Sequence, residues 1–210
     1  MRITRGFLEG LNENGGYDID IVDVIKKDIK PCRGCFACWQ NLDKKCVQQD
    51  DQNGILKLYE EADIIIWSFP LYCFSMPSQL KTVLDRTIPL LRMTMTVDAD
   101  GRVRHVPLVD FSKKRTVVIT GCGFPDWDGN FEALKLQCRN CFRNLTMVCV
   151  PETPMLNVPP AAPLADRLIA KFRDAGREFA STGALAQETI KELEIPMIPR
   201  DEYIKHANGL

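Results

Sequence analysis

Histidine is scarce in this chain, with only His105 and His206 among its 210 residues. The scarcity argues against metal sites built on several histidines and against a catalytic triad built around a pair of them. His105 follows a polar turn, where a lone histidine is more often a solvated side chain than a general acid. We therefore identify no catalytic side chain from the sequence.

The chain also lacks an excess of charge and a long hydrophobic run. Its 27 Lys and Arg residues balance 28 Asp and Glu residues, so no basic surface for nucleic acid or an anionic membrane is expected. The longest uncharged stretch, residues 64–80, contains Pro70 and Pro77 and is shorter than the roughly 20 apolar residues of a membrane span. No charged and apolar leader opens the chain. These absences predict a cytoplasmic protein without nucleic-acid or membrane partners.

The composition is that of a globular domain, with 45% hydrophobic and 26% charged residues. Apolar runs and alternation predict strands over residues 18–24, 64–67, 116–120 and 146–150, the runs at 64–67 and 116–120 being buried on both faces. Helical spacing predicts helices over residues 3–11, 50–61, 78–90, 130–144, 164–180 and 187–193. Strands that alternate with helices indicate an open parallel α/β sheet. We expect a domain over residues 1–150 with a hairpin insertion at 93–106, and a helical C-terminal extension over 151–210 packed on the same domain.

Four of the nine cysteines form a compact run. Cys32, Cys35, Cys38 and Cys46, called the cysteine run below, have the spacing C-x2-C-x2-C-x7-C. Four closely spaced thiolates suit a 4Fe-4S cluster, and this spacing resembles that of bacterial ferredoxins. Zinc is a weaker interpretation because its sites more often use two separated C-x2-C pairs. Reduced thiols without a metal are the third interpretation, and the residues alone leave all three open.

The remaining cysteines are interpreted mainly as packing residues. Cys138 and Cys141 also form a C-x2-C pair, but on a predicted helix, where residues three apart share a face. Burial in the core is favoured there over a redox dithiol. Cys149 lies in the last predicted strand and is expected in the core for the same reason.

The loops after two predicted strands are the expected ligand site. In open parallel sheets, ligands bind outside the carboxyl ends of the strands. This rule selects residues 70–75 and 121–127, which are rich in glycine, proline and aromatic residues.

Several segments together carry a family resemblance. They are Pro31 to Cys35 with the rest of the cysteine run, Asp50-Asp51, Ser68 to Tyr72, Met76-Pro77, Leu80-Lys81 and Asp85-Arg86. Their order and spacing resemble those of the flavodoxin-like NAD(P)H-dependent FMN reductases, and the cysteine run is similar to that of the iron-sulfur flavoproteins. The resemblance implies a flavodoxin-like three-layer sandwich with a parallel sheet, and an oxidoreductase that uses FMN.

The resemblance also implies which residues contact the cofactor. Loop A, formed by Pro70, Leu71, Tyr72, Cys73 and Phe74, would pack beside the isoalloxazine. Loop B, formed by Thr120, Gly121, Cys122 and Gly123, would approach its other side. A flat ring needs an apolar slot, close backbone and N–H donors, which such loops provide. The competing interpretation is that the aromatic residues Tyr72, Phe74, Phe124 and Trp127 only fill the core.

The start of the chain departs from the family pattern. Family members begin with an apolar strand and a phosphate-binding loop, whereas residues 1–4 here lead straight into the first predicted helix. We expect the upstream reading frame to encode this strand and loop. Without them, we expect the chain to bind FMN weakly or not at all.

Two functions follow as hypotheses. In the first, FMN takes hydride from NAD(P)H and reduces a small acceptor such as a quinone, a nitro compound or a flavin. In the second, an FMN and iron-sulfur electron carrier takes electrons from ferredoxin, and the cysteine run favours it. A binding module that has lost its cofactor is the remaining alternative. A homodimer or higher oligomer is expected from the resemblance alone.

Overall fold

The computed structural model describes residues 1–40 and 43–209. The described chain forms two compact units, each described here by itself. Unit 1 consists of Met1–Ile19, Ile66–Met76 and Arg115–Leu210. Unit 2 consists of Asp20–Ile65 and Pro77–Lys114. The C-terminal helices therefore belong to the same unit as the last two strands of the sheet, while the domain boundary expected at residue 150 stays a prediction.

Unit 1 is built on a sheet with the strand order β1-β4-β5. The strands are β1 (Ile64–Pro70), β4 (Arg115–Gly121) and β5 (Leu145–Val150), and the first two residues of β1 lie in unit 2. β4 and β5 run parallel, with Thr116 opposite Leu145 and Gly121 opposite Val150. Almost all of β4 is buried, as its continuous apolar sequence predicts. β1 is less buried than predicted because it is at the edge of this sheet.

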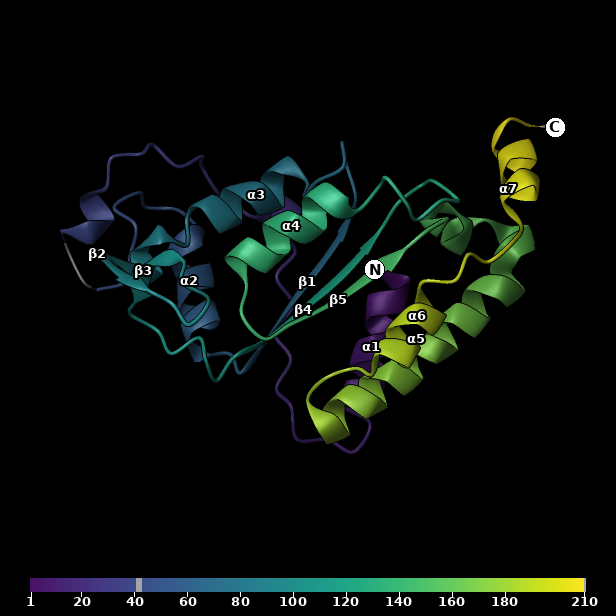
Figure 1. Cartoon of the computed structure of the whole chain (residues 1–210), viewed down its shortest axis with the longest axis horizontal. Helices are drawn as coiled ribbons and strands as arrows, with labels where there is room; N and C mark the ends of the chain where they lie inside the picture. Colours follow the sequence, from purple (N-terminus) through teal and green to yellow (C-terminus); the bar gives the residue numbers. More distant parts are fainter. Residues whose placement is uncertain (41–42, 210) are drawn as a thin grey trace. The chain divides into compact units, whose positions relative to one another are not determined.

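Helices cover both faces of this sheet. The helices of unit 1 are α1 (Arg2–Leu11), α4 (Glu132–Cys141), α5 (Ala162–Thr182), α6 (Gln187–Leu193) and α7 (Arg200–Ala207), the last of which lies beyond the end of the sheet. Figure 1 shows α4 on one side of the sheet and α1 with α5 on the other. α1 and α5 are in close contact, since Gly10 and Gly176 leave no room for a side chain between them. Phe7 and Phe179 meet edge to face beside these glycines, with ring centroids 5.7 Å apart.

Unit 2 has a small core of its own. It contains α2 (Gln52–Glu61), α3 (Ser78–Asp85) and an antiparallel hairpin of β2 (Leu91–Val97) and β3 (Val103–Pro107). Leu56, Leu90 and Val109 form the buried cluster, with Tyr59 and Phe111 packed against it. The hairpin pairs Met95 with His105, and its turn forms at residues 98–101 as predicted. The structure therefore contains the expected hairpin.

Most predicted elements are present, with three informative differences. Residues 15–23 form neither helix nor strand, although their alternation predicts a strand, because an extended segment becomes a strand only when its backbone pairs. The helix expected over 78–90 ends at Asp85, and a 3-10 turn over Ile88–Leu90 follows around Pro89, which cannot continue an α-helix. α7 was not predicted, because Arg, Asp, Glu, Lys and His make up five of its eight residues. No helix of the described residues is both long and apolar enough to cross a membrane.

Candidate functional site: two adjoining loops and a cysteine pocket

Loop A turns sharply at the end of β1. Tyr72 and Ser75 exchange two backbone hydrogen bonds, of 3.1 and 3.0 Å. Between them, Cys73 and Phe74 have left-handed backbone conformations, with φ of 49° and 61°. Such conformations cost non-glycine residues free energy and are concentrated at functional sites. The turn leaves the rings of Tyr72 and Phe74 largely exposed, whereas Leu71 is buried.

Loop B is held against the chain that follows β5. Cys122 N donates to Val150 O at 3.0 Å, and Thr153 N donates to Cys122 O at 2.9 Å. A Cβ on Gly121 would lie 2.1 Å from the Thr153 methyl group, so only glycine fits there. The Cys122 thiol is buried, and burial raises its pKa. The hydroxyl of Thr120 is also buried and has no hydrogen-bond partner among the described residues.

A backbone hydrogen bond joins the two loops: Leu71 N donates to Gly121 O at 2.7 Å. The two loops therefore adjoin at the ends of β1 and β4. The N–H groups of Cys73, Phe74 and Gly123 have no acceptor among the described residues. Exposed aromatic rings and free N–H donors are the features that a flat, polar-edged ring system needs.

The loop aromatics do not all behave alike. Tyr72, Phe74 and Phe124 are at least half exposed, so they do not fill the core. Trp127 instead packs against Phe131, and the Lys135 ammonium lies 3.3 Å from the centre of its ring. The core-filling interpretation therefore applies to Trp127 alone.

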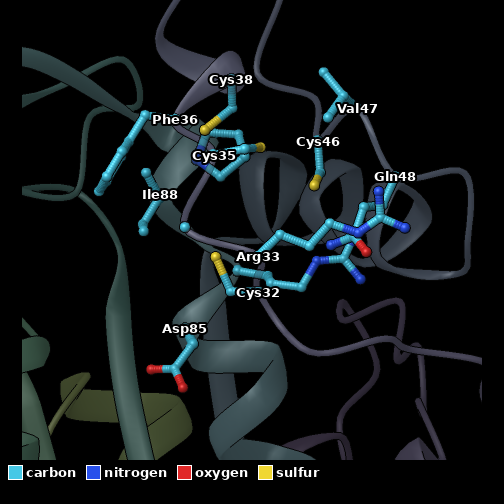
Figure 2. Close-up of a pocket in the computed structure, with 13 residues that line it drawn as sticks. Cys32, Arg33, Cys35, Phe36, Cys38, Cys46, Val47, Gln48, Asp85 and Ile88 are labelled. Carbon is cyan, nitrogen blue, oxygen red and sulfur yellow. The ribbon is translucent and has the colours of Figure 1, made fainter.

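The cysteine run lines one pocket of unit 2, together with Arg33, Phe36, Arg86 and Pro89 (Figure 2). Cys32 and Cys35 are exposed, and Cys38 and Cys46 are half-buried. Burial raises the pKa of Cys38, and the nearby thiols of Cys46, Cys35 and Cys32 add to this effect. All four cysteines of the run therefore line the same pocket.

Hydrogen bonds hold the chain on both sides of the cysteine run. They come from Arg86, which directly follows α3, and from residues in and before α2. The buried Arg86 guanidinium binds both carboxylate oxygens of the buried Asp50 side chain and donates to Lys30 O at 2.9 Å. Gln48 donates to Pro31 O at 3.2 Å, and Asn53 accepts from Cys46 N at 2.8 Å. These contacts join the residues before Cys32 to the residues after Cys46.

The four thiols do not form a preformed single-ion site. Within residues 1–40 and 43–209, no three His, Cys, Asp or Glu side chains are placed to hold one metal ion. Zinc needs its four ligands within about 2.3 Å of one ion. A 4Fe-4S cluster is held by four cysteine thiolates, and four cysteines line this pocket. Zinc, a cluster and free thiols are distinguished below by experiment.

The other cysteines divide differently from the prediction. Cys138 and Cys149 are fully buried as expected, and burial raises the pKa of Cys138 to about 12. Cys141, expected on the same buried face as Cys138, is exposed near the end of α4.

Two residues near loop B were missed by sequence reasoning. Glu152 is fully buried two residues after β5, and Tyr203 of α7 donates to Gly123 O at 2.8 Å. The strand-end rule could have selected Glu152, because it follows a parallel strand as loops A and B do. No local pattern in the sequence connects Tyr203 with Gly123.

The chain is similar to several curated iron-sulfur flavoproteins. One from Archaeoglobus fulgidus is 36% identical over 77 residues, which are 37% of this chain and 34% of that protein. Another, from Methanosarcina thermophila, is 35% identical over 91 residues, 43% of this chain and 46% of that protein. The chain thus matches less than half the length of these relatives.

Comparison with solved structures shows the fold. An FMN-dependent NADH-azoreductase from Bacillus anthracis, in complex with FMN, has a TM-score of 0.59 and 18% identity, covering 85% of this chain and 90% of that one. An NAD(P)H:quinone oxidoreductase from Methanothermobacter marburgensis has a TM-score of 0.59 and 17% identity, covering 85% and 87%. The chain therefore has an α/β flavodoxin-like fold with a parallel sheet, a small antiparallel hairpin and C-terminal helices.

The family model described as NADPH-dependent FMN reductase matches residues 2–158, which contain both loops and the cysteine run. Because this match covers more than half of the chain, the chain belongs to the NADPH-dependent FMN reductase family of oxidoreductases.

Proposed function

We propose that this protein is an FMN-dependent oxidoreductase that transfers electrons from NAD(P)H to a small acceptor such as a quinone, a nitro compound or a flavin. The observation that carries the proposal is the hydrogen bond from Leu71 N to Gly121 O, which joins loops A and B at the strand ends. Family membership and the likeness to an FMN-bound azoreductase support it.

The residues of the two loops bind and orient the ring in this proposal. FMN, when bound, supplies the hydride chemistry. The N–H groups of Cys73, Phe74 and Gly123 would donate to its polar edge, and Tyr72 and Phe74 would shield it from water. Gly121 lets the backbone of loop B approach closely, because a side chain there would collide with Thr153.

A glycine substitution tests this site. Gly121→Val adds a Cβ that would lie 2.1 Å from the Thr153 methyl group, together with two further methyl groups. Loop B therefore has to move away. We expect the affinity for FMN to weaken at least tenfold, which is about 1.4 kcal/mol. Quenching of flavin fluorescence measures this affinity. NAD(P)H oxidation in the presence of FMN should fall with it.

Gly54→Ala is the matched control, because a Cβ at Gly54 has open space. It should leave FMN binding and turnover unchanged. Wild-type protein that binds FMN but oxidises neither NADH nor NADPH would contradict the proposed reaction. Wild-type protein that binds no FMN would contradict the proposed function and agree with the expectation that the cofactor needs the leading strand and phosphate-binding loop.

A second function is favoured by the cysteine run. In it, Cys32, Cys35, Cys38 and Cys46 hold a 4Fe-4S cluster, which supplies one-electron transfer, and ferredoxin replaces NAD(P)H as the donor. The shared pocket of the four thiols and the names of the curated relatives support this proposal.

Removing one thiolate tests the cluster. Cys35→Ser should abolish acid-labile sulfide and the broad visible absorption of anaerobically purified protein, while any flavin bands remain. Cys141→Ser, which changes an exposed thiol of α4, is the control and should leave iron and sulfide unchanged. Wild-type protein with zinc but no sulfide would overturn the cluster in favour of a zinc site. Wild-type protein with no metal at all would overturn it in favour of free thiols.

Three further expectations stay predictions. They are the homodimer or higher oligomer, the cytoplasmic location, and the complete three-layer sandwich with its leading strand and phosphate-binding loop.

A further inference from the structure

The first residues of α7 and the segment before them contact loop B and the chain next to it. Tyr203 Oη donates to Gly123 O at 2.8 Å, and Arg200 Nε donates to both carboxylate oxygens of Asp126, at 2.8 and 3.1 Å. All of these residues belong to unit 1. The contacts span roughly 75 to 80 positions of the sequence, so they are tertiary contacts rather than part of a local turn.

Glu152, which lies two residues after β5, binds the segment that precedes α7. Its Oε2 accepts from Met197 N at 2.6 Å and from Ile198 N at 3.2 Å. Its own backbone N donates to Phe124 O at 3.0 Å, directly after loop B. Glu152 therefore holds loop B with its backbone and the C-terminal segment with its side chain.

The burial and the backbone conformation of Glu152 both cost free energy, so its contacts with the C-terminal segment are not incidental. Glu152 is fully buried and has a left-handed backbone, with φ of 57°. Its Oε1 is buried without a partner among the described residues, and burial raises the pKa of the carboxyl group. Buried carboxyl groups and left-handed non-glycine residues both cost free energy, and they persist where the surrounding structure fixes them.

We propose that residues 195–203, called the buttress below, position loop B for the flavin, with Arg200 and Tyr203 as positioning residues and Glu152 as the residue that binds the buttress to the chain after β5. The inference rests on the proposed FMN site. Arg200 and Tyr203 lie after the segment matched by the family model, whereas Glu152 lies inside it. Without the buttress, Gly123 O and Asp126 lose their partners in α7, and loop B keeps its hydrogen bonds with Leu71, Val150 and Thr153.

Tyr203→Phe is the most conservative test, since it removes one hydroxyl and keeps the buried ring. We expect FMN affinity to fall about three- to tenfold, the range for one hydrogen bond of ordinary strength. The visible bands of the bound flavin should shift, because the backbone beside the ring changes position. Tyr17→Phe is the matched control in unit 1, as the Tyr17 hydroxyl has no hydrogen-bond partner among the described residues.

Amide hydrogen exchange of the FMN-free protein provides a measurement that does not depend on the flavin. In Tyr203→Phe and in Arg200→Gln, the peptide covering residues 121–126 should exchange faster than in wild type, whereas β4 and α5 should be unchanged. Unchanged exchange in both variants, or an unchanged FMN affinity and flavin spectrum in Tyr203→Phe, would overturn the buttress. If wild type binds no FMN, the proposed function fails, and hydrogen exchange alone decides whether the buttress holds loop B.

Discussion

Arg86→Met is expected to destabilise unit 2 by about 3–5 kcal/mol, the usual cost of leaving a buried charge without its partner. The side chains of Arg86 and Asp50 are 1% and 0% exposed, and they form a bidentate pair. Burial alone would lower the pKa of Arg86, but its hydrogen bonds to the Asp50 carboxylate and the nearby Cys46 thiol raise that pKa above its ordinary value. The variant leaves Asp50 buried and also frees Lys30 O. Urea unfolding with equilibrium detection measures the loss.

The double variant Asp50→Asn/Arg86→Gln tests how much of the stability loss comes from leaving the Asp50 charge without its partner. It removes both charges, so its free energy of unfolding should fall by less than that of Arg86→Met. Lys81→Met, which breaks the exposed pair with Asp85 one turn earlier in α3, is the matched control and should cost under about 1 kcal/mol. Equal stability losses for Arg86→Met and Lys81→Met would contradict the account of Arg86.

The same pair gives a dependence on pH. Burial tends to raise the pKa of Asp50, but hydrogen bonds from Arg86, Lys30 N and Gln52 N outweigh it and lower the pKa below its ordinary value. The folded state therefore prefers the ionised carboxylate. Its stabilising contribution is present above the ordinary pKa of an aspartate and is lost as the pH falls through the lowered value.

The sequence predicts the elements of this fold better than the contacts between them. Continuous apolar residues place β4 and β5, and helical spacing places α1, α2, α4, α5 and α6, because burial on one face or both leaves a periodic pattern. Residues 18–24 show the limit of this rule. Their alternation is real, but a strand also needs a paired backbone, which the pattern of one segment cannot supply.

The candidate site shows the same division. The C-x2-C-x2-C-x7-C spacing leaves a cluster, zinc and free thiols open, and the structure shows the four cysteines lining one pocket. The strand-end rule selects the segments that contain loops A and B, whereas the hydrogen bond that joins the loops is seen only in the structure. The partners of Asp50 and Gly123 lie 36 and 80 positions away, and no periodic pattern encodes contacts between single side chains at such separations.

The glycines at the contact of α1 and α5 give a test in which two effects oppose one another. An exposed glycine inside a helix is less favourable than alanine by about 1 kcal/mol, so helix propensity alone predicts that Gly176→Ala stabilises the protein. A Cβ at Gly176, however, would lie 2.1 Å from Phe7 O and 2.7 Å from Leu11 N. Both are backbone atoms of α1, which cannot rotate away as a side chain could.

We therefore expect Gly176→Ala to lower the free energy of unfolding by about 1–3 kcal/mol, the usual cost of overpacking, despite the gain in propensity. Moving α1 outward would also separate Phe7 from Phe179 and disturb the ion pairs of Arg173 with Glu9 and Arg177 with Glu13. Calorimetry should show a fall of about 2–4 °C in Tm for each kcal/mol. Gly54→Ala, in the exposed first turn of α2, gains helix propensity without the collision and should raise the stability instead. If both Gly176→Ala and Gly54→Ala stabilise the protein, the backbone of α1 leaves room for a methyl group at Gly176. The close approach of α1 and α5 would then be contradicted.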